Sequence, residues 1–231
     1  MARKHGPTIA LLPDDIEIPP GIDDLGRFRH WSQSASFPPS GRIDWIAGRI
    51  EVDMSPEDLY THGSPKTAIA TVLSQEIYVP RRGLVFIDAT RISSPAADLS
   101  AEPDVVVLLE DALTSGRARL VEKASGERDR FVEIEGAVDL VVECVSDSSA
   151  AKDWTRLREL YHRAGVPEYW VVDARRDAIE FAVLLHHAGG YEPSRPLADG
   201  FARSALLGRE VRLVRSRSAS GLVFYSLELR P

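Results

Sequence analysis

The chain has 231 residues, of which 44% are hydrophobic and 27% are charged, with a formal net charge of −7. These values are typical of a globular protein with one substantial core, or one core plus extensions. The sequence has no apolar run of the roughly 20 residues that a membrane-spanning helix needs, and the apolar stretch after the basic N-terminus is too short for a signal peptide. A single cysteine, Cys144, excludes an internal disulfide framework and predicts a cytoplasmic protein.

The negative net charge argues against a surface that carries positive charge over most of its area for nucleic-acid binding. One local basic cleft is nevertheless sufficient for nucleic-acid chemistry. Positive charge does concentrate near the C-terminus, at Arg203, Arg209, Arg212, Arg215 and Arg217. Alternating charges of this kind are typical of a solvated edge strand, which is the simpler interpretation of this segment.

Residues 1–41 predict an extended N-terminal arm, because prolines and glycines interrupt them and no helical or alternating pattern is present. Apolar residues in this arm, among them Phe28 and Trp31, could dock on the main body. Residues 42–231 predict a single domain, which begins with a hairpin at 43–52.

Further elements follow in chain order. Apolar residues at helical spacing predict a helix over 65–77 with Ser64 as its N-cap. A polar hairpin facing solvent is predicted near 117–135, and a helix is predicted from Ser148 or Ser149 to about Ala164. The predicted strands are 84–88, 105–109, 138–145, 168–173, 179–186, 211–214 and 222–229. This mixture predicts an α/β or α+β fold with a mixed β-sheet flanked by helices.

Two acids stand out because each lies in or beside a run of valine and leucine. Asp104 precedes the strand at 105–109, and Glu143 lies within the strand at 138–145. A buried carboxylate is costly unless a cation or hydrogen bonds compensate it. If the two strands are neighbours, both acids can hold one Mg²⁺, with Mn²⁺ as a substitute, for phosphodiester hydrolysis. Either acid alone could instead be a strand-end residue that faces water.

Lys152 lies just beyond Glu143, at the start of the predicted helix. The positive helix end and a nearby metal would both lower the pKa of its amine. Such a lysine could orient or deprotonate the attacking water, or neutralise charge on the phosphate. An ordinary surface lysine is the alternative. Cys144 points to the strand face opposite to Glu143, which favours a core role.

Several short motifs are specific in combination: Asp44-Trp45-Ile46-Ala47-Gly48, Met54-Ser55-Pro56, Glu102-Pro103-Asp104, Val141-Val142-Glu143-Cys144-Val145-Ser146, and above all the run 160–173. With these motifs the chain resembles the Uma-two-type putative restriction endonucleases, a branch of the PD-(D/E)XK nuclease superfamily. The resemblance implies a mixed sheet of four or five strands flanked by helices, with Asp104 and Glu143 as metal ligands.

The same resemblance concerns two further residues. Asp44 matches an acidic position that the family usually fills with glutamate, so it is either a third metal-binding carboxylate or a strand-end surface acid. His62 is similar in position to a family histidine, for which phosphate contact and a capping or surface role both stay open.

The chain departs from the family pattern at the lysine. The superfamily's usual lysine position is Val145 here, and the position that this branch commonly uses is Leu157. Lys152 is therefore the best substitute, with Arg156 as second choice.

The sequence thus predicts a Mg²⁺-dependent endonuclease acting on DNA. We expect a homodimer, because cutting both strands of a duplex needs two sites. A catalytically degenerate nuclease fold serving as a binding or assembly module is the first alternative. A hydrolase of small phosphorylated or nucleotide substrates is the second.

Overall fold

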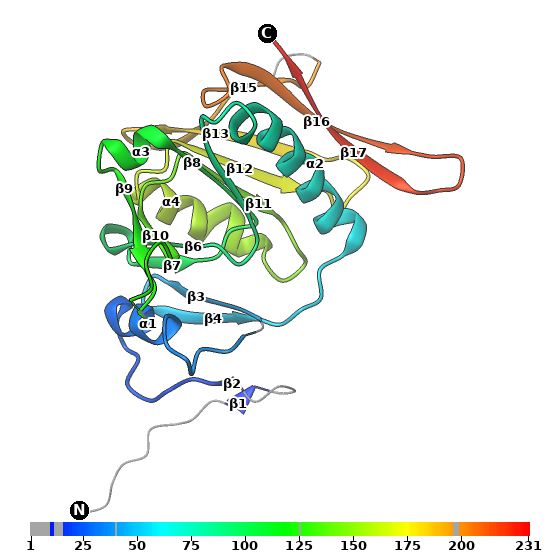
Figure 1. Cartoon of the computed structure of the whole chain (residues 1–231). Coiled ribbons are helices and arrows are strands. Elements are labelled where there is room, and N and C mark those ends of the chain that lie inside the picture. The colour runs from blue at the N-terminus through cyan, green and yellow to red at the C-terminus, as the bar shows by residue number, and fades with distance from the viewer. Residues whose placement is uncertain (1–9, 12–15, 40, 125, 196–198) are drawn as a thin grey trace, which may run out of the picture.

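The computed structural model describes residues 10–11, 16–39, 41–124, 126–195 and 199–231, and is built around a six-stranded sheet (Figure 1). In order across the sheet, its strands are β14 (Gly190–Pro193), β13 (Glu180–His187), β12 (Glu168–Asp173), β11 (Leu140–Cys144), β8 (Val105–Leu109) and β5 (Gly83–Ile87). Strands β11 and β12 are parallel, and the other neighbours are antiparallel. The predicted mixed sheet is therefore confirmed.

Helices cover both faces of this central sheet, as Figure 1 shows. On one face, α4 (Arg158–Arg163) packs with Val141 in one hydrophobic cluster, and on the other α2 (Ser64–Leu73) packs with Val142 in a second. Successive residues of β11 thus enter different clusters, because side chains alternate across a strand. Coverage on both faces explains why this strand is almost continuously apolar in sequence.

A second sheet lies beside the first and also has six strands. In order, they are β4 (Arg49–Asp53), β3 (Arg42–Ile46), β7 (Leu99–Ala101), β6 (Arg91–Ser94), β10 (Phe131–Gly136) and β9 (Ala118–Glu122). The hairpin predicted near 117–135 corresponds to β9 and β10. It does not simply face solvent, because β10 pairs in parallel with β6 and buries Ile134.

The remaining elements are smaller. They comprise β1 (Ala10–Leu11), β2 (Ile16–Glu17), α3 (Glu110–Thr114), the 3₁₀ turn Pro95–Ala97, the π-helical segments Leu59–Gly63, Ser74–Tyr78 and Lys152–Leu157, and a third sheet of β15 (Ala202–Ser204), β16 (Arg209–Arg217) and β17 (Val223–Arg230). Among the described residues, no helix has the length and apolar character that crossing a membrane requires.

The N-terminal region contains a helix that the sequence did not predict. Helix α1 (Leu25–Ser32) begins at Asp24, whose side chain accepts a hydrogen bond from the Arg27 amide at 2.8 Å. Phe28 and Trp31 are buried in a cluster with residues of β3. The expected docking of these aromatics is present, and their burial stabilises a helix too short to persist alone.

The predicted cap of helix α2 is also different. Ser64 lies inside a longer helical segment that starts one turn earlier, where the Asp58 carboxylate accepts hydrogen bonds from the amides of Tyr60 and Thr61 at 2.9 and 2.7 Å. The earlier carboxylate satisfies amides that a helix start leaves open, so Ser64 is not needed as the cap.

Candidate active site

The two acids singled out in the sequence lie on neighbouring strands. Asp104 immediately precedes β8, and Glu143 lies in β11, which pairs antiparallel with β8. The amide of Cys144 donates a hydrogen bond to Asp104 Oδ2 at 2.7 Å, so the backbone beside one acid binds the other acid. Both carboxylates are buried, with exposures of 0% and 2%.

Arg42, the first residue of β3, connects the two acids. Its Nη2 donates to Asp104 Oδ1 at 2.6 Å, and its Nη1 lies 4.0 Å from Glu143 Oε2. One guanidinium therefore lies near both carboxylates, hydrogen-bonded to Asp104 and at the outer limit of an ion pair with Glu143. Sequence reasoning missed this residue, although it adjoins the hairpin that carries Asp44.

The two acids differ in their electrostatics. Burial alone would raise the pKa of Asp104, but the hydrogen bond from His62 and the Arg42 guanidinium outweigh it and hold this pKa well below its usual range. Burial, together with the charges of Asp104 and Asp153, raises the pKa of Glu143. The Tyr161 hydroxyl donates to Glu143 Oε1 at 2.7 Å and fixes its orientation.

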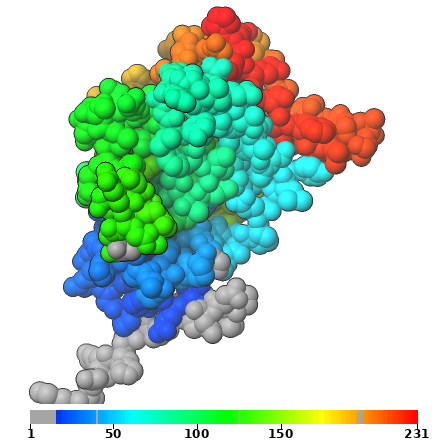
Figure 2. All heavy atoms as spheres, viewed as in Figure 1, coloured from blue at the N-terminus to red at the C-terminus, as the bar shows by residue number. Residues whose placement is uncertain are grey.

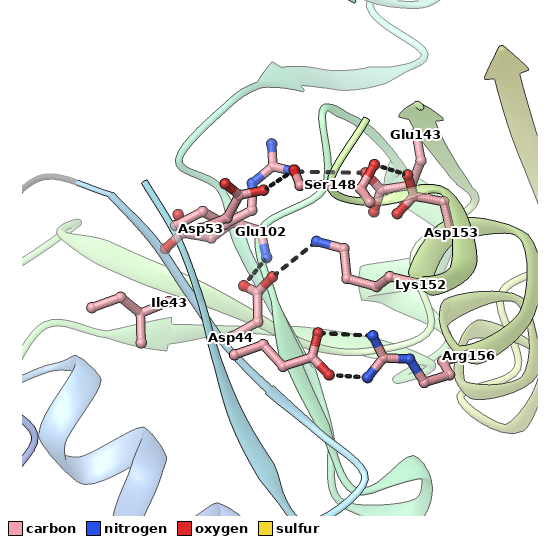
Figure 3. Close-up of polar contacts among 12 residues, drawn as sticks. Ile43, Asp44, Asp53, Glu102, Glu143, Ser148, Lys152, Asp153 and Arg156 are labelled. Carbon is pink, nitrogen blue, oxygen red and sulfur yellow. Dashed lines mark hydrogen bonds and ion pairs between the residues drawn. The ribbon is translucent and has the colours of Figure 1, made fainter. Parts of the chain in front are cut away.

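Asp44 and Lys152 face each other from β3 and the π-helical segment (Figure 3). Lys152 Nζ lies 3.8 Å from Asp44 Oδ2, and the amide of Glu102 donates to Asp44 Oδ1 at 3.0 Å. Asp44 is 2% exposed and Lys152 7% exposed, so neither is a surface residue.

The pKa of Lys152 is raised in this structure, whereas the sequence predicts that the helix end and a bound metal would lower it. Burial would lower it, but the carboxylates of Asp44 and Glu143 outweigh burial and raise the pKa of this amine. Lys152 is therefore a charged donor among the acids, better suited to neutralise negative charge than to accept a proton.

Asp153 is a further buried acid that sequence reasoning missed, although it follows Lys152 directly. It is 1% exposed, and the Ser149 hydroxyl donates to its Oδ2 at 2.5 Å. Its Oδ1 is buried without a hydrogen-bond partner. Burial raises the pKa of Asp153 to about 6, and the charge of Asp104 adds to this effect.

His62 is buried rather than exposed, so the surface role left open for it is wrong. Its Nε2 lies 3.3 Å from Asp104 Oδ2, and its Nδ1 lies 3.1 Å from Glu57 Oε2. One ligand atom from each of these three residues lies within 4.8 Å of the others, a spacing that could hold a metal ion. Lys66 completes the surroundings by donating to Glu57 at 2.8 Å.

The usual lysine positions of the family belong to the core in this chain. Val145 and Leu157 are 0% and 1% exposed and lie in the cluster beneath α4. Arg156, the second choice from the sequence, forms a bidentate ion pair with Glu51 of β4 (Figure 3). Of the two residues predicted to replace the family lysine, Lys152 and Arg156, Lys152 is the one that contacts a buried acid, Asp44.

Two small cavities reach this site. One of about 260 Å³ is lined by Arg42, Asp53, Glu57, His62 and Ser146, and one of about 130 Å³ is lined by Arg42, Asp44, Glu51, Lys152 and Arg156. Arg42 borders both cavities, so a polar ligand could approach the acids from either side of its guanidinium.

Comparisons with known proteins give the family and a similar fold. A family model described as "Putative restriction endonuclease", Uma2, matches residues 26–213. A crystal structure of a putative nuclease belonging to DUF820 from Anabaena variabilis is similar in fold, with a TM-score of 0.53 and 17% identity over 72% of this chain and 83% of that chain. No curated protein matches the chain. The match over most of the sequence shows that the chain belongs to the Uma2 family of putative restriction endonucleases.

Proposed function

We propose that this chain is a Mg²⁺-dependent endonuclease that hydrolyses DNA phosphodiester bonds. The observation that carries the proposal is the position of the Arg42 guanidinium, 2.6 Å from Asp104 and 4.0 Å from Glu143 on neighbouring strands, with Lys152 on the adjoining segment 3.8 Å from Asp44. The family supports a nuclease function, and the DNA substrate is inferred from it. Phosphodiester hydrolysis depends on strong neutralisation of negative charge, which this arrangement can supply.

The residues present fit a hard divalent cation. Asp104 and Glu143 would hold it, and Asp44 would contribute a third carboxylate by moving toward the cation, because among the described residues the three-ligand cluster within 4.8 Å joins Asp104 to Glu57 and His62. The Oδ1 of Asp153 is a further buried oxygen without a hydrogen-bond partner. Carboxylate oxygens are the ligands that Mg²⁺ and Mn²⁺ prefer. In the structure the Arg42 guanidinium compensates the negative charge of Asp104 and Glu143. A divalent cation beside the same two carboxylates would compensate that charge in the same way. When bound, the cation would supply Lewis acidity toward the phosphate.

The chain's own residues would have distinct tasks. The Lys152 ammonium, whose pKa burial lowers but Asp44 raises more, would neutralise charge that develops on the phosphate. Tyr161 would keep Glu143 oriented, and His62 would hold Asp104. Tyr161 and His62 are thus positioning residues.

The location and assembly of the protein are parts of the same proposal. The buried free thiol of Cys144 is compatible with a reducing cytoplasm, where we place the activity. A homodimer would supply the two sites that cleavage of both strands needs.

The C-terminal arginines offer little support for DNA binding, since Arg212 pairs with Glu228 at 2.6 Å and Arg209 with Glu76 at 3.3 Å.

Calorimetry with Mn²⁺ tests the proposal, followed by cleavage of supercoiled plasmid in Mg²⁺. We expect the full chain to bind Mn²⁺ and to cut the plasmid, and Asp104→Asn and Glu143→Gln to lose both properties while keeping the circular dichroism of the native protein. Glu51→Gln is the matched control, because this acid lies beside the site but pairs with Arg156. Binding that survives both substitutions would refute the proposed ligands.

The burial of Val145 and Leu157 favours a second candidate, a degenerate nuclease fold that binds or assembles without cleavage. In that protein Arg42 would compensate the acids permanently, and no divalent cation would enter. Absence of Mn²⁺ binding, together with DNA binding in EDTA, would favour this candidate over the enzyme.

A further inference from the structure

Strand β5 forms an outer edge of the central sheet. It pairs with β8 on one side, and no described strand pairs with its other side. Its sequence, Gly-Leu-Val-Phe-Ile, contains neither a charge nor a proline, which are the usual protections of an exposed edge. Leu84 and Ile87 are 39% and 49% exposed. The edge therefore has the properties of a surface that another strand covers.

The hydrogen bonds to β8 reveal which backbone groups of β5 remain open. The Asp88 amide donates to Asp104 O at 3.1 Å, and Arg82 O accepts from the Glu110 amide at 3.3 Å. Since alternate residues of an antiparallel strand bond to the same neighbour, the even-numbered residues face β8. The amides and carbonyls of Gly83, Val85 and Ile87 point toward the open edge.

We propose that a second copy of this chain adds its own β5 to this edge, antiparallel, about a two-fold axis through Val85. In this register Val85 lies opposite the partner subunit's Val85, and Gly83 lies opposite the partner subunit's Ile87. All outward amides and carbonyls of both strands are then paired. An isologous contact of this kind closes after two subunits.

Charges at the two ends of β5 select this register and this occupant. With Val85 at the centre, Arg82 lies opposite the partner subunit's Asp88, and the pair is repeated at the other end. Both side chains are exposed and lie on the α2 face: Asp88 accepts from Lys66 of α2 at 2.7 Å, and Arg82 donates to the carbonyl of Glu76, just after α2, at 3.4 Å. A two-fold axis perpendicular to the sheet keeps these faces together. A slip of the register would lose both pairs.

The surface beside β5 has room for a partner. A cavity of about 600 Å³, lined in part by Tyr78, Val79 and Gly83, borders one end of the strand. Another of about 390 Å³, lined in part by Phe86 and Phe131, borders the second sheet. Figure 2 shows the teal-green part of the chain, to which β5 belongs, on the face toward the viewer.

This β5 contact would be the interface of the homodimer proposed above. Only its role, the cleavage of both DNA strands, rests on the proposed nuclease function. It is tested by the mass of the full chain in sedimentation equilibrium. We expect twice the chain mass of 25.5 kDa for the native protein and the single mass for Val85→Pro, which removes an outward amide but no bond to β8. Arg82→Glu should weaken the dimer at least tenfold, whereas Arg49→Glu, at the exposed first residue of β4, should not.

Cross-linking tests the register without relying on Val85→Pro to fold. Under mild oxidation Val85→Cys should form a covalent dimer, because the two residues face each other across the axis within the range that a disulfide spans. Leu59→Cys, which is 80% exposed and lies outside β5 in the π-helical segment, should not. Cys144 is buried and does not compete.

A monomeric native protein would overturn the proposal, and so would a dimer that survives Arg82→Glu and gives no Val85→Cys cross-link. Neither result depends on metal binding or DNA cleavage, so failure of the interface is distinguishable from failure of the nuclease.

Discussion

Arg42 Nη2 lies 2.6 Å from Oδ1 of Asp104, so the first residue of β3 compensates a carboxylate at the start of β8. The carboxylate is buried, and the arginine side chain is 21% exposed. Removing one partner of such a pair leaves an uncompensated buried charge, which is costly. This relationship connects the stability of the fold with the proposed metal site.

Arg42→Gln should therefore destabilise the metal-free protein by about 3 kcal/mol. Urea unfolding in EDTA measures this change, with Arg49→Gln on the same hairpin as the control. Because a divalent cation would replace the lost positive charge, Mn²⁺ should restore more stability in Arg42→Gln than in the native chain. An equal effect of Mn²⁺ on both proteins would contradict a shared location for the guanidinium and the cation.

His62→Gln should separate the two possible ligand sets around Asp104. If Asp104 and Glu143 hold the ion, loss of the imidazole removes only a contact that positions Asp104. Mg²⁺ affinity should then fall by less than about tenfold, near the smallest loss seen when a residue that orients a metal ligand is replaced. If the Glu57–His62–Asp104 cluster holds it, binding is abolished. We expect the first result, since Mg²⁺ prefers oxygen ligands. Calorimetry alongside Asp104→Asn distinguishes the outcomes.

Lys152→Met should lower plasmid cleavage by about 10²-fold or more, while Mn²⁺ affinity stays within a few-fold. The reason is that the charged amine would act on the phosphate rather than on the cation. Arg156→Met is the matched control, because its guanidinium is engaged by Glu51. Cleavage at the native rate by Lys152→Met would remove this residue from the mechanism.

Glu168→Gln should cost about 1–3 kcal/mol of stability. The carboxylate is buried, and its two oxygens accept from Trp170 Nε1 at 2.6 Å and the Leu206 amide at 2.8 Å. A glutamine has one carbonyl oxygen, so one donor would face an amide group and lose its acceptor. Urea unfolding measures the loss, and Glu192→Gln, at an exposed position of β14, should have little effect.

The same residue predicts a dependence of stability on pH. Burial raises the pKa of Glu168 above its ordinary value of 4.5, against the hydrogen bonds that lower it. As pH rises, the folded protein therefore keeps this proton after the unfolded chain has lost it. The stabilisation that this proton gives the folded protein is present below pH 4.5 and is lost as pH rises from 4.5 through the raised pKa. The difference in unfolding free energy between native and Glu168→Gln proteins should change over this window. A constant difference would contradict the raised pKa.

Local patterns predicted much of the architecture. The apolar runs around Val107 and Val141 gave the central strands, and the Ala47-Gly48 turn gave the β3–β4 hairpin, because burial and turn geometry are encoded over a few neighbouring residues. Strands β6 and β7 escaped prediction. They are short and rich in serine, yet buried, so their pairing depends on the sheet around them rather than on their own residues.

The sequence by itself determined which strands carry acids, since Asp104 directly precedes one apolar run and Glu143 interrupts another, and both runs are typical of a sheet interior. Tertiary structure alone decided what surrounds those acids. Along the chain, Arg42 is 62 positions from Asp104, and His62 is 42 positions from it. A buried charge must be compensated, but the compensating group can come from any segment that folding brings near, and no local periodicity identifies that segment.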